Sequence, residues 1–389
     1  MADFDDQSVE SGAMIGSNED LLIEILHRLP IVSILRFKSV SKHWRSLLSQ
    51  HNLIRLMYGT GLFVGNLFIP YDAVENRSSR FRTLDFYPDQ RRFKIVQSCN
   101  GLLLCCSDVG HSHVRDYFVV NPTTKQCVMI PPVIRGMDVV TSVRFMGLAF
   151  HQTSCVNYKV ICIYRDTQYD ERLQVQIYSS DTGKWKSTLD EYIWVSYYTP
   201  FSGGVYWNGS FLWAPSSVGP KYLKLDIERF FELSLPSPLP ARVAIFGGYR
   251  EGARPLYFGE SRGHLHLVDT SDHENHLHLN VYEMSNDRSG WFVKHRVELD
   301  DLRAAYPDMT RINQQQTRPD YYNFEILDVV RGENDDEDSF MVIKVSKKII
   351  RYNIFDKSFK QIFDLTNTLH ENIGPWDVHR YTGTITSFY

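Results

Sequence analysis

Apolar residues near the start of the chain recur at helical spacing. Between Asp20 and Pro30 (DLLIEILHRLP) they follow an i, i+1, i+4, i+5, i+8 pattern, which places them on one face of a helix. Ser17 lies just before this run and is a suitable N-cap residue. Pro30 is expected to end the helix because proline has no amide donor. The pattern predicts a short helix with one strongly apolar face.

Two more short apolar segments follow this helix. One occupies residues 31–40, and the other begins at Ser41 and carries apolar residues at helical spacing. Three helices within residues 17–58 would bury too little surface to be stable alone, so either a partner protein or the rest of the chain must cover them. Residues 1–16 are acidic and aperiodic, and we expect a disordered leader there.

From Gly61 onward the spacing changes to the alternation of β-strands. Five segments repeat a strand, a polar turn and a second strand, and their last residues follow each other at intervals of 46 to 68 positions. Gly209 and Gly263, each opening a short apolar run, are 54 residues apart, and Gly101 lies twice that distance before Gly209. The five segments are VVNPTTKQC, IYSSDTGKW, LKLDIERFF, VYEMSNDRSGW and RYNIFDKSF. This periodicity predicts a β-propeller of stacked blades, with a plain β-sandwich as the alternative.

Charge and cysteine content exclude several classes of partner and location. A formal net charge of -4 over 389 residues gives no basic surface for phosphate, so nucleic acid is not expected as a partner. No apolar run approaches the roughly 18 residues of a membrane span, so no membrane partner is expected either. Six cysteines form no CxxC pair and no secretory leader is recognisable. We expect an intracellular protein of the nucleus or the cytoplasm.

The front segment resembles a known motif. LLIEILHRLPIVSILRFKSVSKHWRSLLS strongly resembles an F-box, which docks on the Skp adaptor of cullin-based ubiquitin ligases. The family usually has Leu-Pro where this chain has Ser17-Asn18, and this departure implies a weaker contact with the adaptor. The resemblance implies that the adaptor is bound by Leu21, Leu22, Ile25, Leu26, Leu29, Pro30, Leu35, Phe37, Val40, Trp44 and Leu47.

The body of the chain resembles a second family. FVVNPTTKQCVMIPP, YKVICIYR, VQIYSSDTGKWK and GGVYWNGSFLW are similar, in order, to the F-box-associated domain of plant F-box proteins, which is expected to be propeller-like. The two resemblances imply a multidomain α+β protein: a three-helix F-box in residues 17–58, then an all-β domain in residues 62–385. They also imply a non-catalytic ligase subunit, with a Skp-type adaptor, through it a cullin, and an unidentified target protein as partners.

Two short segments are candidates for contact with a target or a charged partner. YIWVSYYTPF (192–201) concentrates aromatic residues, which are good binding anchors, although packing between blades would also explain them. ENDDED (333–338) fits a solvated loop better than a site for a basic partner. The candidate target-binding residues are Tyr192, Trp194, Tyr197 and Tyr198.

The sequence offers weak candidates for metal binding or catalysis. His264, His266, His276 and His278 would form a metal site if a hairpin brought them together, but alternation of inward leucine with outward histidine explains them better. TGKWKST (182–188) lacks the first glycine of a phosphate-binding loop. We therefore expect no catalytic residue, no metal and no cofactor. A propeller enzyme and a protein-interaction adaptor outside any ligase are the alternatives.

Overall fold

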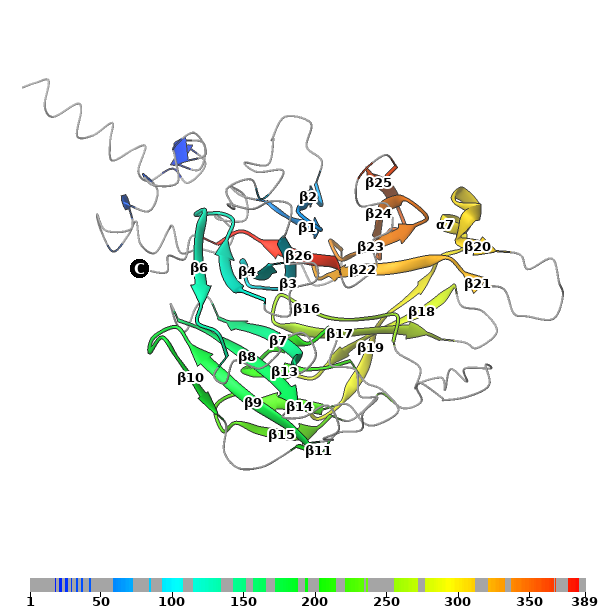
Figure 1. Ribbon diagram of the computed structural model, residues 1–389. Helices are drawn as coiled ribbons and strands as arrows, with labels where there is room; N and C mark the ends of the chain where they lie inside the picture. The colour runs from blue at the N-terminus through cyan, green and yellow to red at the C-terminus, as the bar shows by residue number, and fades with distance from the viewer. Residues whose placement is uncertain are drawn as a thin grey trace, which may run out of the picture.

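The computed structural model shows a ring of β-sheets (Figure 1). One short α-helix, α7 (Asp300–Ala305), and a 3-10 turn, η2 (Pro307–Met309), lie near one edge of the ring. No helix among the described residues is long and apolar enough to cross a membrane. The structure describes residues 59–72, 84, 93–107, 115–133, 143–151, 157–165, 172–187, 193–194, 203–214, 221–233, 236, 255–271, 277–311, 321–332, 337–366, 368 and 377–384, with isolated positions between 18 and 42.

The predicted fold class of a multidomain α+β protein is wrong. The described chain is nearly all β, and no three-helix front domain is present among the described residues. Ahead of Gly59 the described helical positions include Leu22 and Leu26. The physical reason is that helical spacing indicates which segments can be amphipathic, whereas it does not show that three of them pack into a domain. Three predicted helices this short bury too little surface to form a stable domain by themselves.

Six sheets form the blades of a propeller. Five of them contain four consecutive antiparallel strands in sequence order, and blade 3 has an extra strand, β11 (Ile193–Trp194), paired with β9. A separate pair, β20 (Thr310–Arg311) and β21 (Tyr321–Tyr322), lies between blades 5 and 6 in sequence.

Blade 2 contains β3 (Phe93–Cys99), β4 (Leu102–Ser107), β5 (Tyr117–Asn121) and β6 (Gln126–Ile130). Blade 3 contains β7 (Val143–Phe150), β8 (Tyr158–Arg165), β9 (Arg172–Ser179) and β10 (Lys184–Ser187). Blade 4 contains β12 (Val205–Trp207), β13 (Ser210–Leu212), β14 (Lys221–Lys224) and β15 (Arg229–Glu232). Blade 5 contains β16 (Tyr257–Ser261), β17 (His264–Thr270), β18 (His278–Met284) and β19 (Trp291–Glu298). Blade 6 contains β22 (Phe324–Val330), β23 (Phe340–Val345), β24 (Lys348–Asn353) and β25 (Phe359–Asp364).

Blade 1 closes the ring by joining the two ends of the propeller. It contains β1 (Thr60–Val64), β2 (Leu67–Pro70) and β26 (Val378–Thr382). β26 pairs antiparallel with β1, so that Phe63 lies opposite His379. Figure 1 shows this meeting of the blue and red ends of the propeller. Strand pairing between the ends covers an edge that would otherwise be open.

The hydrophobic core lies between neighbouring blades. Each of the six pairs of adjacent blades has its own cluster of buried apolar side chains. Leu62 and Val342, for example, join blades 1 and 6, and Leu148 and Leu104 join blades 3 and 2. This packing between sheets confirms the predicted propeller and excludes the two-sheet sandwich.

The five predicted hairpins are confirmed. Each one joins the third and fourth strands of a blade, from β5–β6 in blade 2 to β24–β25 in blade 6. The turns need positive φ angles, which Lys125, Gly183 and Glu228 adopt directly before the fourth strand. Because strands alternate in direction, these turns lie on the same face of the ring as the turns between first and second strands.

Candidate binding site in the central channel

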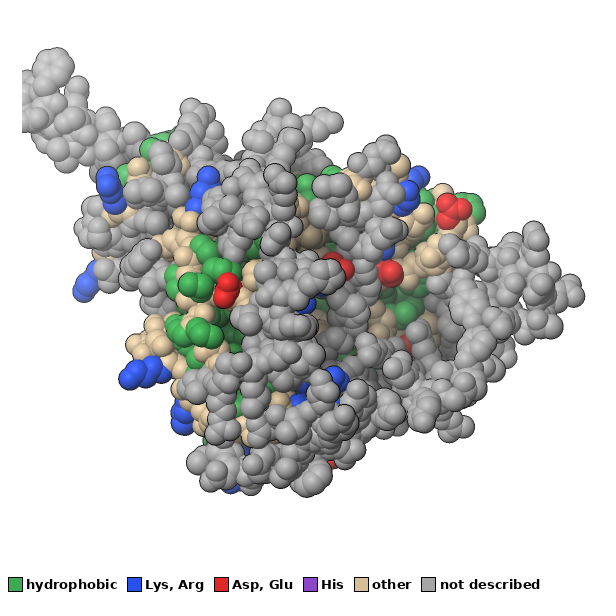
Figure 2. All heavy atoms as spheres, in the orientation of Figure 1, with side chains coloured by type: hydrophobic (Ala, Val, Ile, Leu, Met, Phe, Trp, Pro, Cys, Tyr) green, Lys and Arg blue, Asp and Glu red, His purple; other side chains and the backbone are tan. Residues whose placement is uncertain are grey.

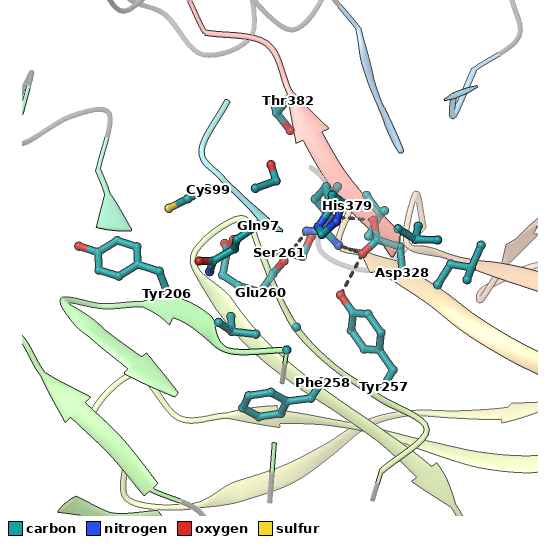
Figure 3. A pocket seen from close by; sticks show the side chains of 18 of the residues that line it. Gln97, Cys99, Tyr206, Tyr257, Phe258, Glu260, Ser261, Asp328, His379 and Thr382 are labelled. Carbon is teal, nitrogen blue, oxygen red and sulfur yellow. Dashed lines mark hydrogen bonds and ion pairs between the residues drawn. The ribbon is translucent and has the colours of Figure 1, made fainter. Parts of the chain in front are cut away.

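The first strands of the blades surround a central channel. Its volume is about 1560 Å³, and β3, β16, β22 and β26 all contribute lining residues. Figure 3 shows polar side chains from these strands gathered around it, among them Gln97, Glu260, Asp328 and His379. Polar and apolar side chains both line this channel, which makes it a candidate site for a ligand or a peptide.

A buried carboxylate organises one wall of the channel. Asp328 in β22 accepts hydrogen bonds from the Tyr257 hydroxyl at 2.9 Å and from Arg380 Nε at 2.7 Å. Arg380 Nη2 and the Tyr71 hydroxyl also donate to this carboxylate. These donors come from blades 1 and 5, so the network joins three blades. The Asp328 side chain is only 2% exposed.

The electrostatics of this network favour a fixed ion pair. Burial disfavours the charge of Arg380, but the Asp328 carboxylate outweighs it and raises the pKa of the guanidinium. Burial, with Asp328 nearby, raises the pKa of both Tyr71 and Tyr257, which therefore remain protonated donors. Both oxygens of the Asp328 carboxylate accept hydrogen bonds from these donors. The network holds blades together.

A second charged group lies between blades 5 and 6. Glu283 in β18 is 2.9 Å from Arg331 Nη1, and 2.9 Å and 3.4 Å from ring nitrogens of His264 and His266. Burial opposes ionisation of Glu283, but His266, His264 and Arg331 outweigh it and lower its pKa to about 2. Burial lowers the pKa of His266. The carboxylate is therefore a stable counter-ion for its neighbours.

The four histidines singled out in the sequence do not converge. His266 lies opposite Glu283, and His278 lies at the start of β18, five residues from Glu283, or about 17 Å along a strand. His276 is outside the described residues. The expectation that the histidines point outward is wrong for His266, which is 3% exposed because blades pack on both faces of the sheet. No group of three potential ligands among the described residues could hold a metal ion.

Polar side chains of β3 attach blade 2 to blade 3 and to the start of blade 4. Gln97 accepts a hydrogen bond from Leu148 N at 2.6 Å and donates to Gly204 O at 2.9 Å. Cys99 donates to Phe150 O at 3.4 Å, and burial raises the pKa of its thiol. Cys99 therefore remains a protonated thiol beside the channel, and its position is explained by blade packing rather than by nucleophilic chemistry.

The structure describes part of the predicted adaptor-binding segment. Leu22 and Leu26 are buried, whereas Leu21 is 49% and Ile25 44% exposed. The cap is Asn18, which accepts from Leu21 N at 3.2 Å, whereas the predicted cap Ser17 is outside the described residues. Leu29 lies in a bend and Phe37 is helical, and both are half-buried. Outside the described residues are Pro30, Leu35, Val40, Trp44 and Leu47.

The predicted target-binding aromatic residues are only partly placed. Trp194 lies in β11, opposite Arg172 of β9. Tyr192, Tyr197 and Tyr198 lie outside the described residues.

The network around Asp328 was not predicted from the sequence. One signal was available, since Asp328 interrupts the otherwise apolar strand FEILDVV, and a charge in a buried strand implies a partner.

Charged side chains are dispersed over the face drawn in Figure 2, where the described Lys and Arg residues stand apart from one another. This face therefore has no concentrated basic patch among its described residues.

Comparison with known proteins assigns the family. A family profile described as the F-box associated beta propeller domain matches residues 37–231. The match begins inside residues 17–58, which were predicted to form a separate front domain. The F-box protein At5g07610 of Arabidopsis thaliana is 30% identical over 396 residues, covering 94% of this chain and 89% of the relative. The Arabidopsis F-box protein At5g49610 is 27% identical and covers 76% of this chain and 83% of the relative.

A chain in the crystal structure of a nidogen/laminin complex covers 84% of this chain and 100% of its own length, at 8% identity and a TM-score of 0.39. A similarity this weak supports no conclusion about the protein. The match to the profile, the similarity to the first relative along nearly the whole chain and the six-bladed ring agree with one another. The chain belongs to the F-box protein family whose members carry an F-box-associated β-propeller domain.

Proposed function

We propose that this protein is the substrate-recognition subunit of a Skp-cullin-F-box ubiquitin ligase. The observation that carries the proposal is a helical turn that leaves two large apolar side chains exposed ahead of a closed propeller, in a chain of the F-box family. These side chains are Leu21 and Ile25. They lie one helical turn apart and so form one continuous apolar surface.

The exposed turn is the proposed contact with the Skp-type adaptor. Leu22 and Leu26 are buried and hold the turn in place, while Leu21 and Ile25 are free to insert into an apolar groove of a partner. Burying two such side chains against a partner would contribute a few kcal/mol, about 1.5 to 3 kcal/mol for each one buried completely. Through the adaptor the chain would join a cullin, inside the cell.

The propeller is the proposed receptor for a target protein. Its six blades form a closed ring that is stiffened by the Asp328 network, and a rigid scaffold binds a partner with little loss of entropy. The chain would contribute no bond chemistry. Its contribution would be proximity, because a target lysine held beside a charged conjugating enzyme reacts at a high effective concentration.

Co-purification with an adaptor tests this proposal. The full chain mixed with a purified Skp-type adaptor should elute from size-exclusion chromatography as a 1:1 complex. Addition of cullin and its RING partner should shift this complex to a larger one. A 1:1 complex that excludes cullin would favour a protein-interaction adaptor outside the ligase, and separate elution of chain and adaptor would contradict the ligase function.

A further inference from the structure

A turn of blade 5 reaches across to blade 4 on one face of the ring. Arg288 lies in the turn between β18 and β19, and its Nη2 donates to Asn208 O at 2.8 Å and to Ser210 Oγ at 2.9 Å. Both acceptors belong to the first turn and the second strand of blade 4. Arg288 therefore occupies the seam between the two blades.

The positive charge of Arg288 has no counter-ion among the residues that the structure describes. Its guanidinium carbon lies 4.7 Å from the ring centre of Tyr222 and 5.4 Å from that of Trp207. Among the described residues no carboxylate lies within ion-pair distance of it, and its buried Nε has no acceptor. The neighbouring Asp287 turns its carboxylate to Ser289 N, at 3.0 Å. Carbonyl, hydroxyl and ring contacts orient a guanidinium but do not neutralise it.

Exposed apolar side chains lie on the strands of both blades at this seam. Phe231 stacks on Tyr222, with ring centres 5.3 Å apart, and is 38% exposed. Tyr222 packs on the cluster shared by blades 4 and 5, so Phe231, its cross-strand neighbour, faces the same seam. Val293 is 39% exposed and follows Trp291, another member of that cluster, by two residues on β19. Both side chains therefore border the seam from opposite blades.

We propose that this seam, defined by Arg288, Tyr222, Phe231 and Val293, binds a segment of the target protein that presents a carboxylate beside an apolar side chain. The inference rests on the proposed function, since it names the target-binding surface of the propeller. A carboxylate would supply the counter-ion that Arg288 lacks, through a charge-assisted hydrogen bond. The apolar side chain would cover Phe231 and Val293. Arginine and aromatic residues are the types that dominate binding energy at protein interfaces.

Selection from a phage-displayed library of random heptapeptides on the full chain tests the inference. Selected peptides should carry Asp or Glu within two residues of Leu, Ile, Met, Phe or Trp. After synthesis with a fluorescent label, they should bind Arg288→Gln and Phe231→Ala at least tenfold more weakly than the wild type. Arg296→Gln, an exposed arginine of β19, and Phe355→Ala, an exposed phenylalanine of blade 6, are the matched controls and should change affinity less than twofold.

Melting temperatures must accompany these measurements, because Arg288 also joins two blades. If the Arg288→Gln variant unfolds, peptide binding by Phe231→Ala tests the inference instead, because the Phe231 side chain is exposed. The inference is overturned if no peptide is enriched, if enriched peptides lack the acidic and apolar pair, or if they bind both variants unchanged. It is also overturned if the seam proves to be a dimer contact, seen as dimers that Phe231→Ala separates.

Adaptor titration of the same variants separates this inference from the proposed function. Both seam variants should bind the adaptor as the wild type does. If the wild type binds selected peptides through the seam but does not bind the adaptor, the ligase proposal fails while the seam remains a binding surface.

Discussion

Arg380 Nε donates to Asp328 Oδ2 at 2.7 Å, and this contact links the last strand of the propeller to the first strand of blade 6. β26 also pairs with β1, so one strand is attached to both of its neighbours by different means. The ring is therefore closed by backbone hydrogen bonds on one side and by a buried ion pair on the other. The closure gives the proposed receptor domain its rigidity.

Removing the charge of Asp328 should strongly destabilise the protein. Asp328→Asn would leave the Arg380 guanidinium buried without a counter-ion, and breaking a buried ion pair costs about 3 to 5 kcal/mol. Urea denaturation should show this loss in the free energy of unfolding. The control is Glu298→Gln, which removes the exposed pair with Lys357 and should change little. Equal effects of the two variants would refute the closing role of Asp328.

Stability should fall between neutral pH and pH 5. Burial lowers the pKa of His379 to about 4, against 6.5 for an ordinary histidine. The unfolded chain therefore binds a proton in this range that the folded protein does not, and stability decreases as pH falls through the interval between the two pKa values. His266 acts in the same direction. His379→Gln should reduce the difference in the free energy of unfolding between pH 7 and pH 5, and an unchanged difference would rule His379 out as a cause.

Below pH 4.5 the protein should also lose the contribution that the Glu283 carboxylate makes to its stability. Glu283 has a folded pKa of about 2 against an ordinary value of 4.5, so its stabilising effect is present above pH 4.5 and is lost as pH falls toward 2. Glu283→Gln should therefore be less stable than the wild type at pH 6, and the two should converge near pH 2. Denaturation curves at both pH values measure this, and a constant difference would contradict the assignment.

Substitutions in two equivalent turns should change the stability of the protein in opposite directions. Gly183 and Lys125 each have a positive φ directly before the fourth strand of their blades. Gly183→Ala meets no neighbouring atom, so its cost of about 1 kcal/mol would come from the backbone angle alone. Lys125→Gly should gain a few tenths of a kcal/mol, about the difference between relieved strain and the added freedom of glycine. Thermal unfolding would show both changes, and equal signs would refute this account.

The sequence predicted the hairpins because their signals are local. A turn such as SSDTG stands between two alternating segments, so strand, turn and strand are all visible within ten residues or so. The regular recurrence of these units then predicted the propeller. Closure was not predictable in the same way, because β1 and β26 pair across almost the whole domain.

The channel network could not be predicted for a similar reason. Asp328 and Arg380 are 52 residues apart, and Tyr71 is 257 residues from Asp328. Only the isolated charge in an apolar strand indicated that Asp328 needed a partner. The front segment failed differently: its spacing put Leu21, Leu22, Ile25, Leu26 and Leu29 on one apolar face without separating buried from exposed positions, and it did not establish a separate helical domain.

Calorimetric titration of a purified Skp-type adaptor into the full chain tests the central claim most directly, with Ile25→Asp and Ile227→Asp as a matched pair. Both isoleucines are exposed, by 44% and 48%, so neither substitution should unfold the protein, and circular dichroism would check this. We predict micromolar or tighter binding by the wild type and by Ile227→Asp, and binding at least tenfold weaker by Ile25→Asp. Absence of binding by the folded wild type, or equal binding by both variants, would contradict the account.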